Sequence, residues 1–150
     1  MTDSDWASCR STRRSNSGGL ILIGKHLINH WCRVQPRIAL SSGEAEFYSS
    51  IKGVQEAIHV EEMFLEEREI EPSLVHHVDA VACKGILLRH GVGQLKHMET
   101  KMMWIQGEIK RRKIRVIKVH REDNPPDALA SASLCEPFER HIASMGGKFN

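Results

Sequence analysis

Carboxylates occur in four groups that lie far apart in the sequence, each at an end of an expected helix or strand. The groups are Asp3 with Asp5, Glu44 with Glu46, Asp79, and Asp127. Carboxylate oxygens are ligands that Mg²⁺ prefers, and two such ions can activate a water and stabilise the leaving oxygen of a phosphodiester. If these element ends meet at one edge of a sheet, the acids predict a magnesium centre suited to phosphodiester chemistry.

Each acid also has an ordinary structural explanation. The helix dipole favours acids in a first turn, which accounts for Glu44, Glu46 and Asp127 without a metal, and Asp79 is typical of a turn after a strand. The pattern leaves the choice between Glu44 and Glu46 open. It also leaves Asp5 as an alternative to Asp3, because side chains two apart on a strand share a face.

The N-terminal half of the sequence predicts a strand hairpin and then a long helix. A polar loop at residues 7–18 precedes a strand at 19–24, which is apolar enough to be buried on both faces. A Lys25-His26 link and a strand at 27–34 complete the hairpin. Ser41 to Glu44 supply capping hydroxyls and an acid for a helix that ends near 67–69. Its apolar face is formed by Phe47, Ile51, Val54, Ile58 and Leu65.

The C-terminal half alternates strands with helices. The sequence predicts a strand at 74–79, helices at 80–89 and 98–113, a strand at 114–120 and a last helix opened by Asn124-Pro125-Pro126-Asp127. A short stretch at 2–5 adds a strand stub. Strands separated by helices imply parallel pairing, whereas the hairpin is antiparallel. The order therefore predicts an α/β fold with a mixed sheet flanked by helices.

Length and composition indicate a single domain. The 150 residues are 41% apolar, which we interpret as one domain at 1–135 followed by a C-terminal tail at 136–150. With 21 basic and 19 acidic residues, bulk charge does not indicate a nucleic-acid binder, so any basic surface must be local. The sequence has no long apolar run and a polar start, so we expect an intracellular protein, or a fragment of a larger one, that does not span a membrane.

Cysteines, paired histidines and tryptophans are given structural roles. The wide spacing of Cys9, Cys32, Cys83 and Cys135 predicts reduced thiols rather than a zinc knuckle. His76 and His77 point to opposite faces of a strand and are not expected to chelate one ion. Trp6 and Trp31 are expected in the core.

Three sequence blocks resemble the ribonuclease H region of copia-type retrotransposon polyproteins. They are Thr2-Asp3-Ser4-Asp5-Trp6-Ala7, Thr12-Arg13-Arg14-Ser15-Asn16-Ser17-Gly18 and Ala39-Leu40-Ser41-Ser42-Gly43-Glu44-Ala45-Glu46-Phe47. The family has approximately S-D-A-D-W-A-G, T-R-R-S-T-S-G and A-L-S-S-x-E-A-E-Y at these places. The similarity continues in Val78-Asp79, Lys96-His97-Met98-Glu99 and Asn124-Pro125-Pro126-Asp127, so it covers about residues 2–131.

This resemblance implies a ribonuclease H-like fold, a five-stranded mixed sheet with helices on both sides. It also implies cleavage of the RNA strand of RNA–DNA hybrids with two Mg²⁺ (or Mn²⁺) ions, in a polyprotein that carries a reverse transcriptase domain. The family's four metal-binding carboxylates match Asp3, Glu46, Asp79 and Asp127. Independent of the family, these residues belong to the acids already singled out at element ends.

Basic residues and histidines are secondary candidates. A phosphate backbone requires cations, and Arg13, Arg14, Arg33 and Lys96 are the candidates for nucleic-acid binding, with Arg111, Arg112 and Lys113 as further ones. A solvated surface is the alternative for each of them. His120 resembles a histidine that aids product release in cellular ribonucleases H, and His97 matches a frequent family histidine; a strand end and helix packing are the alternatives.

The sequence departs from the family pattern in places that affect substrate contacts and the first strand. Ala80 stands where the family has Asn or Ser, Met103 replaces a family histidine, and the last helix lacks the family's Thr-Lys. Only Met1 and Thr2 precede Asp3, so the first strand is expected to be truncated. Loss of ladder hydrogen bonds and core side chains in that strand predicts lower stability.

Overall fold

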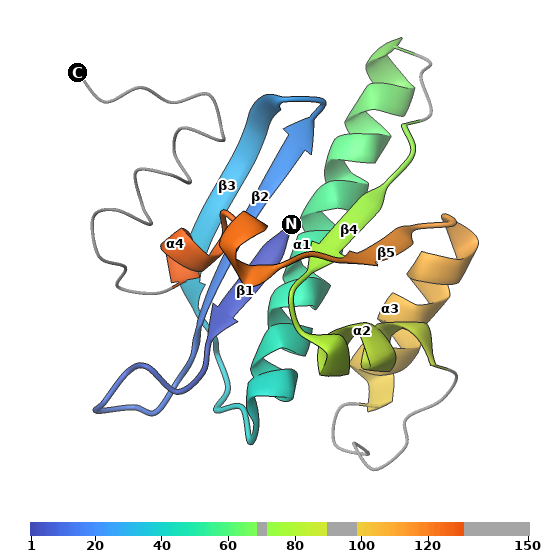
Figure 1. Ribbon diagram of the computed structural model, residues 1–150. Helices are drawn as coiled ribbons and strands as arrows, with labels where there is room; N and C mark the ends of the chain where they lie inside the picture. Colours follow the sequence, from blue (N-terminus) through green and yellow to red (C-terminus); the bar gives the residue numbers. More distant parts are fainter. Residues whose placement is uncertain (69–71, 90–98, 131–150) are drawn as a thin grey trace, which may run out of the picture.

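The structure is a computed structural model that describes residues 1–68, 72–89 and 99–130 (Figure 1). A three-stranded antiparallel sheet has the order β1-β2-β3, formed by β1 (Thr2–Asp5), β2 (Asn16–Ile23) and β3 (His26–Val34). Its pairing sets Asp3 opposite Gly18 and Gly19 opposite Trp31. Helix α1 (Ser42–Arg68) packs against β1 and β2.

A second pair of strands lies on the other side of β1. The strands β4 (Val75–Val78) and β5 (Arg115–Lys118) pair in parallel, with His76 opposite Val116. Helices α2 (Val81–Leu88) and α3 (Glu99–Arg111) connect them and pack on each other and on α1. A single turn of 3₁₀ helix at Arg121–Asp123 leads to α4 (Asp127–Ala130), which packs on β1 and β2.

The main core lies between α1 and the β4–β5 pair, with α2 and α3 closing it. It contains Phe47, Ile51 and Val54 from α1, together with Val78, Cys83, Leu87, Met102, Ile105, Ile109, Ile114 and Val116. The predicted helical face is therefore confirmed for its first three members, and Ile58 is partly buried against the same cluster, whereas Leu65, near the end of α1, is exposed. No helix in the described ranges is both long and apolar enough to cross a membrane.

The predicted α/β class is confirmed, but the five strands found within residues 1–68, 72–89 and 99–130 form two sheets rather than one. In the described part of the chain, β1 and β4 are neighbours without ladder pairing. Strand β1 has only four residues, so its register with β2 extends from Asp5 only to Thr2, with one further pair of bonds between Met1 and Leu20.

Two details of the predicted hairpin are corrected. The link is Gly24-Lys25 rather than Lys25-His26, because Gly24 takes a φ of 61°, which two-residue turns require and glycine tolerates. Strand β2 is not buried throughout. Gly19 and Leu20 are buried, but Ile21 and Leu22 are half-buried and Ile23 is exposed. That second half borders a cavity.

The other structural expectations have mixed outcomes. Trp31 is buried, as predicted, but Trp6 is 51% exposed. Cys9, Cys32 and Cys83 are free thiols, whereas Cys135 and the predicted tail at 136–150 lie outside the described residues. The predicted domain limits of 1–135 are not tested by the described ranges and stay a prediction.

Gly19 is predicted to be intolerant of any side chain. A Cβ at this position would overlap Cζ2 of the buried Trp31 ring, so Gly19→Ala must displace the indole or the strand. We expect Gly19→Ala to lower the free energy of unfolding by about 1–3 kcal/mol, the usual cost of overpacking. Chemical denaturation of both proteins measures this difference.

Gly107→Ala in α3 is the matched control, because nothing lies within 4 Å of a Cβ there. That change should raise stability by about 0.5–1 kcal/mol through helix propensity. Equal effects of the two substitutions would contradict the assigned contact between β2 and Trp31.

Candidate metal centre at the ends of β1 and β4

Three carboxylates from distant parts of the sequence converge beside β1. Asp3 lies in β1, Glu46 in the second turn of α1 and Asp79 immediately after β4. One oxygen from each lies within 4.8 Å of the others. Asp3 and Glu46 are 4% and 6% exposed. The three carboxylates are therefore brought together by the packing of β1, the start of α1 and the end of β4.

The elements fix these carboxylates through local hydrogen bonds. Ser4 donates both its backbone N–H and its Oγ–H to Glu46 Oε1, at 2.9 and 2.7 Å. Asn124 donates its Nδ2–H to the Thr2 carbonyl at 3.1 Å and to Asp3 Oδ1 at 3.4 Å. Ser49 on α1 donates to the Asp3 carbonyl at 2.6 Å. Strand β1 is thereby tied to both α1 and the segment before α4.

Burial and mutual repulsion raise the proton affinity of the centre. Burial, followed by the nearby charges of Glu46, Asp79 and Asp127, raises the pKa of Asp3 from 3.8 to about 8. Burial raises the pKa of Glu46 to about 7, against the opposing effect of the Ser4 hydrogen bonds. The pKa of Asp79 is also raised, chiefly by burial. Anions held this close require a proton or a cation between them.

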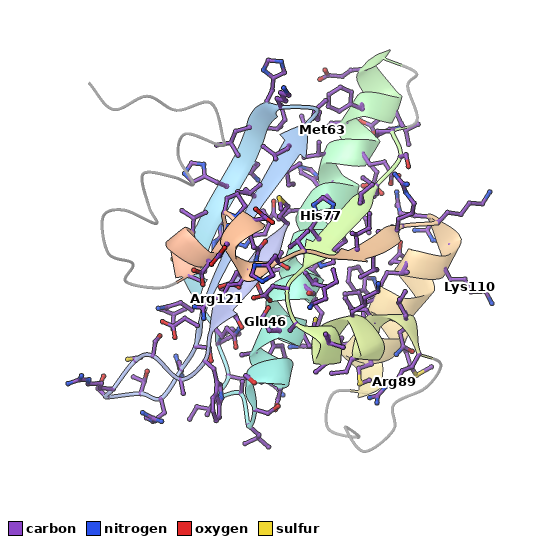
Figure 2. The ribbon with its side chains drawn as sticks, viewed as in Figure 1. Glu46, Met63, His77, Arg89, Lys110 and Arg121 are labelled. Atoms are coloured by element: carbon purple, nitrogen blue, oxygen red, sulfur yellow. The ribbon has the colours of Figure 1, made fainter. Side chains whose placement is uncertain are left out.

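Asp127 lines a cleft that also contains the three carboxylates. The cleft has a volume of about 310 Å³ and is lined by Asp3, Ser4, Asp5, Trp6, Ser42, Glu46, Asp79, Ala80, Arg121 and Asp127. Arg121 donates from Nε and Nη2 to Asp127 Oδ1, at 3.2 and 3.0 Å. Figure 2 shows Arg121 and Glu46 in this region, beside β1. The fourth predicted acid is thus present in the cleft, with its carboxylate engaged by a guanidinium.

The donor set fits divalent cations. Carboxylate oxygens are the hard ligands that Mg²⁺ and Mn²⁺ accept. Glu46 Oε2 and Asp79 Oδ1 are buried without a hydrogen-bond partner in the described residues. Buried polar oxygens of that kind normally have a partner, and a bound cation would supply one. Asp3, Glu46 and Asp79 are therefore the residues placed to hold a metal, with Asp127 at the edge of the set.

The geometry favours one residue in each pair that the sequence left open. Asp5 lines the cleft, but Asp3 is the residue within the three-carboxylate group. Glu44 Oε2 instead accepts a hydrogen bond from the Leu40 N–H at 2.8 Å, and the Glu44 N–H donates one to Ser41 Oγ at 3.2 Å. Glu44 thus helps to begin α1, as its first-turn position suggested.

The predicted nucleic-acid-binding cations are not gathered at the cleft. Arg13 and Arg14 are exposed on the loop between β1 and β2, and Arg33 is exposed on β3. None of these three lines the cleft in the described ranges. Lys96 lies outside the described residues, as does His97. His120 is exposed just before the 3₁₀ turn, and it too does not line the cleft.

Among the further basic candidates, Arg112 is corrected to a structural role. Its guanidinium bonds to Glu61, to Glu62 at 2.7 Å and to Glu108 at 3.1 Å. This network ties α3 to α1. An arginine engaged by three carboxylates is a poor candidate for phosphate binding.

Sequence reasoning missed the cleft roles of Ser4, Trp6 and Arg121. Trp6 was expected in the core, but it lines the cleft with half its surface exposed, and its Nε1 donates to the Ala39 carbonyl at 3.1 Å. For Ser4, adjacency to Asp3 was the available signal. For Arg121 no signal existed in the sequence, because its contact with Asp127 depends on the turn at Arg121–Asp123.

The pH dependence of stability tests the buried acids. A carboxyl whose pKa is raised on folding contributes stability that is complete below its unfolded pKa and is lost as the pH rises through its folded pKa. With Asp3 moving from 3.8 to about 8 and Glu46 to about 7, the metal-free protein should lose stability between about pH 4 and 8. The expected loss is on the order of a few kcal/mol. Denaturation in EDTA across this range measures it.

Asp3→Asn should flatten the pH dependence of stability and remove any stabilisation by Mg²⁺ at pH 8. Asp5→Asn is the control, and it should leave the pH dependence and the effect of Mg²⁺ close to those of the wild type. The reason is that only Asp3 belongs to the group of three. Mg²⁺ should stabilise the wild type less at pH 5, where protons compete for the same oxygens. Identical behaviour of the two variants would contradict the assignment of Asp3 to the centre.

Comparisons with known proteins indicate a retroelement relationship. No known protein-family profile and no solved structure matches the chain. The chain is 25% identical over 141 residues to the retrovirus-related Pol polyprotein from transposon TNT 1-94 of Nicotiana tabacum, covering 92% of this chain and 10% of that protein. It is 44% identical over 45 residues to an uncharacterized mitochondrial protein of Arabidopsis thaliana, covering 30% of this chain and 19% of that protein. The chain thus spans about a tenth of the Pol polyprotein it resembles, and the similarity supports a retrotransposon origin.

Proposed function

We propose that this chain is a ribonuclease H that hydrolyses the RNA strand of RNA–DNA hybrids with two Mg²⁺ or Mn²⁺ ions. The observation that carries the proposal is the convergence of Asp3, Glu46 and Asp79, with Asp127 in the same cleft. These are the acids that match the carboxylates of copia-type ribonucleases H. The similarity to a transposon Pol polyprotein supports the same assignment.

Asp3, Glu46 and Asp79 are the residues that would hold the cations, with Asp127 as the fourth acid. When bound, the cations would activate a water and neutralise charge on the scissile phosphate. Ser4 holds the Glu46 carboxylate by hydrogen bonds to Oε1. The other oxygen, Oε2, has no hydrogen-bond partner in the described residues and would be the one to contact a cation. Burial of Asp3 and Glu46 keeps their oxygens in a low dielectric, where electrostatic attraction to a cation is strong.

Side chains at the rim of the cleft are suited to a polynucleotide. Arg121 is exposed over most of its side chain and places a cation at the rim, next to Asp127. Trp6 offers an exposed aromatic ring for stacking on a base or sugar. Ser42 lines the same cleft and carries a hydroxyl able to contact a 2′-hydroxyl, the group that distinguishes RNA from DNA. Arg13, Arg14, Arg33 and Lys96 remain proposed contacts to more distant phosphates.

The proposed partners follow from this reaction. They are the RNA–DNA hybrid and a reverse transcriptase domain of the same polyprotein, which would produce that hybrid. An intracellular location is part of the proposal.

A second candidate function is an inactive remnant that binds nucleic acid. The observation that favours it is Ala80, which lines the cleft at a position where the family has Asn or Ser and which offers no polar side chain to a substrate.

Cleavage of an end-labelled RNA–DNA hybrid tests the proposal. We expect wild-type protein in MgCl₂ to cut only the RNA strand, and EDTA to abolish cutting. Asp79→Asn should lower the rate by more than about 100-fold, because it removes a carboxylate of the proposed metal set. Asp123→Asn is the matched control, because Asp123 is exposed and does not line the cleft, and it should cut like wild type.

Circular dichroism of each protein separates loss of function from loss of fold. A folded wild-type chain that binds the hybrid without cutting it would favour the inactive remnant. Equal cutting by wild type and Asp79→Asn would contradict the proposed role of Asp79.

A further inference from the structure

Arg121 is the one cation among the described residues that line the cleft. The other charged residues of the lining are acids, namely Asp3, Asp5, Glu46, Asp79 and Asp127. Figure 2 shows the Arg121 side chain in the region of Glu46, beside β1. A cleft lined by five carboxylates repels the phosphates of a nucleic acid. The position and partners of this single guanidinium therefore bear directly on how a polyanion can enter.

The backbone on either side of Arg121 and Asp127 is fixed to β1. Asn124 is fully buried and donates its Nδ2–H to the Thr2 carbonyl at 3.1 Å. The Asn124 N–H donates to the Arg121 carbonyl at 3.1 Å, and the Asp127 N–H donates to the Asn124 carbonyl at 3.0 Å. Asn124 thus holds both members of the ion pair close to the strand that carries Asp3.

The side chain of Arg121 is bound to Asp127 and is otherwise open to solvent. Its Nε and Nη2 both donate to Asp127 Oδ1, at 3.2 and 3.0 Å. The Arg121 side chain is 70% exposed, against 17% for Asp127. An ion pair with so exposed a member changes an equilibrium constant by at most about fivefold. The guanidinium can therefore leave Asp127 for another anion at little cost.

The same guanidinium acts on the other acids of the centre. Burial raises the pKa of Asp3 and of Asp79, and the charge of Arg121 opposes that rise at both carboxyls. The pKa of Arg121 is itself raised chiefly by its hydrogen bond to Asp127, and further by the charges of Asp3 and Asp79. Asp127 lies outside the group of three carboxylates found among the described residues. Arg121 is thus placed to compete with a cation for Asp127.

We propose that Arg121 is a positioning residue that exchanges partners when the cleft binds its ligands. In the protein without cation or nucleic acid, Arg121 holds Asp127. When a phosphate of a polynucleotide enters the cleft, the guanidinium turns to that phosphate, and Asp127 becomes available as a further ligand for a divalent cation. This inference rests on the proposed function, because it requires a cleft that takes both a cation and a nucleic acid.

The exchange couples the binding of the two ligands. Engagement of Asp127 by a cation frees Arg121 for a phosphate, and engagement of Arg121 by a phosphate frees Asp127 for a cation. Each ligand must then raise the affinity for the other by the same factor. Arginine suits this role because its guanidinium makes paired hydrogen bonds to carboxylate and to phosphate alike.

A double-mutant cycle on Mn²⁺ affinity, measured by calorimetry without nucleic acid, tests the first half of the exchange. Arg121→Gln should raise the Mn²⁺ affinity by about two- to fivefold, because the cation no longer competes with the guanidinium for Asp127. In the Asp127→Asn background the same substitution should have no effect. Arg115→Gln is the matched control, because Arg115 is exposed on β5 and does not line the cleft, and it should bind Mn²⁺ like wild type.

Binding of an RNA–DNA hybrid tests the second half. The affinity for a labelled hybrid is compared in EDTA and in Ca²⁺, which takes the same oxygen ligands, and a denaturing gel verifies that the hybrid stays intact. Ca²⁺ should raise the affinity of the wild type and of Arg115→Gln equally. The gain should be about two- to fivefold smaller in Arg121→Gln, which has no guanidinium to release. Circular dichroism verifies that each variant folds.

Two results would overturn the exchange while leaving the proposed function intact. One is an equal rise in Mn²⁺ affinity from Arg121→Gln with and without Asp127, which would indicate a general effect of charge. The other is an equal effect of Ca²⁺ on hybrid binding by wild type and Arg121→Gln. A folded wild type that binds no Mn²⁺ or no hybrid would instead overturn the proposed function together with this inference. Both expected effects in a chain that does not cut the hybrid would support the exchange in an inactive remnant.

Discussion

The packing of three carboxylates against one another is the constraint on which the rest of the structure depends. Asp3, Glu46 and Asp79 repel each other when ionised, and the burial of Asp3 and Glu46 removes water that would screen them. The fold must therefore hold them in place with bonds that are formed elsewhere. It does so through Ser4 on Glu46 and Ser49 on the Asp3 carbonyl, so the arrangement of the three acids is maintained at some cost to local stability.

The stability that offsets this cost lies mainly in the other half of the molecule. The apolar cluster of α1, α2, α3 and the β4–β5 pair is the larger core, and Arg112 ties α3 to α1 from outside. The three-stranded sheet is held differently, by the Gly19–Trp31 contact and by α4 against Gly18. The candidate centre lies where these two halves meet, so its geometry depends on how firmly β1 is anchored between them.

The sequence by itself determined the elements, because their signals are local. The apolar spacing and caps of α1, the hairpin and the strand–helix alternation need only neighbouring residues, and the acids at element ends were visible for the same reason. Tertiary structure decided which acids meet. The packing of β1 on α1 selected Asp3 over Asp5 and Glu46 over Glu44, and a two-residue shift of β1 would have put Asp5 in the place of Asp3. It also moved Trp6 from an expected core position to the cleft and engaged Asp127 with Arg121. The division of the strands into two sheets likewise depends on long-range pairing that no local pattern encodes.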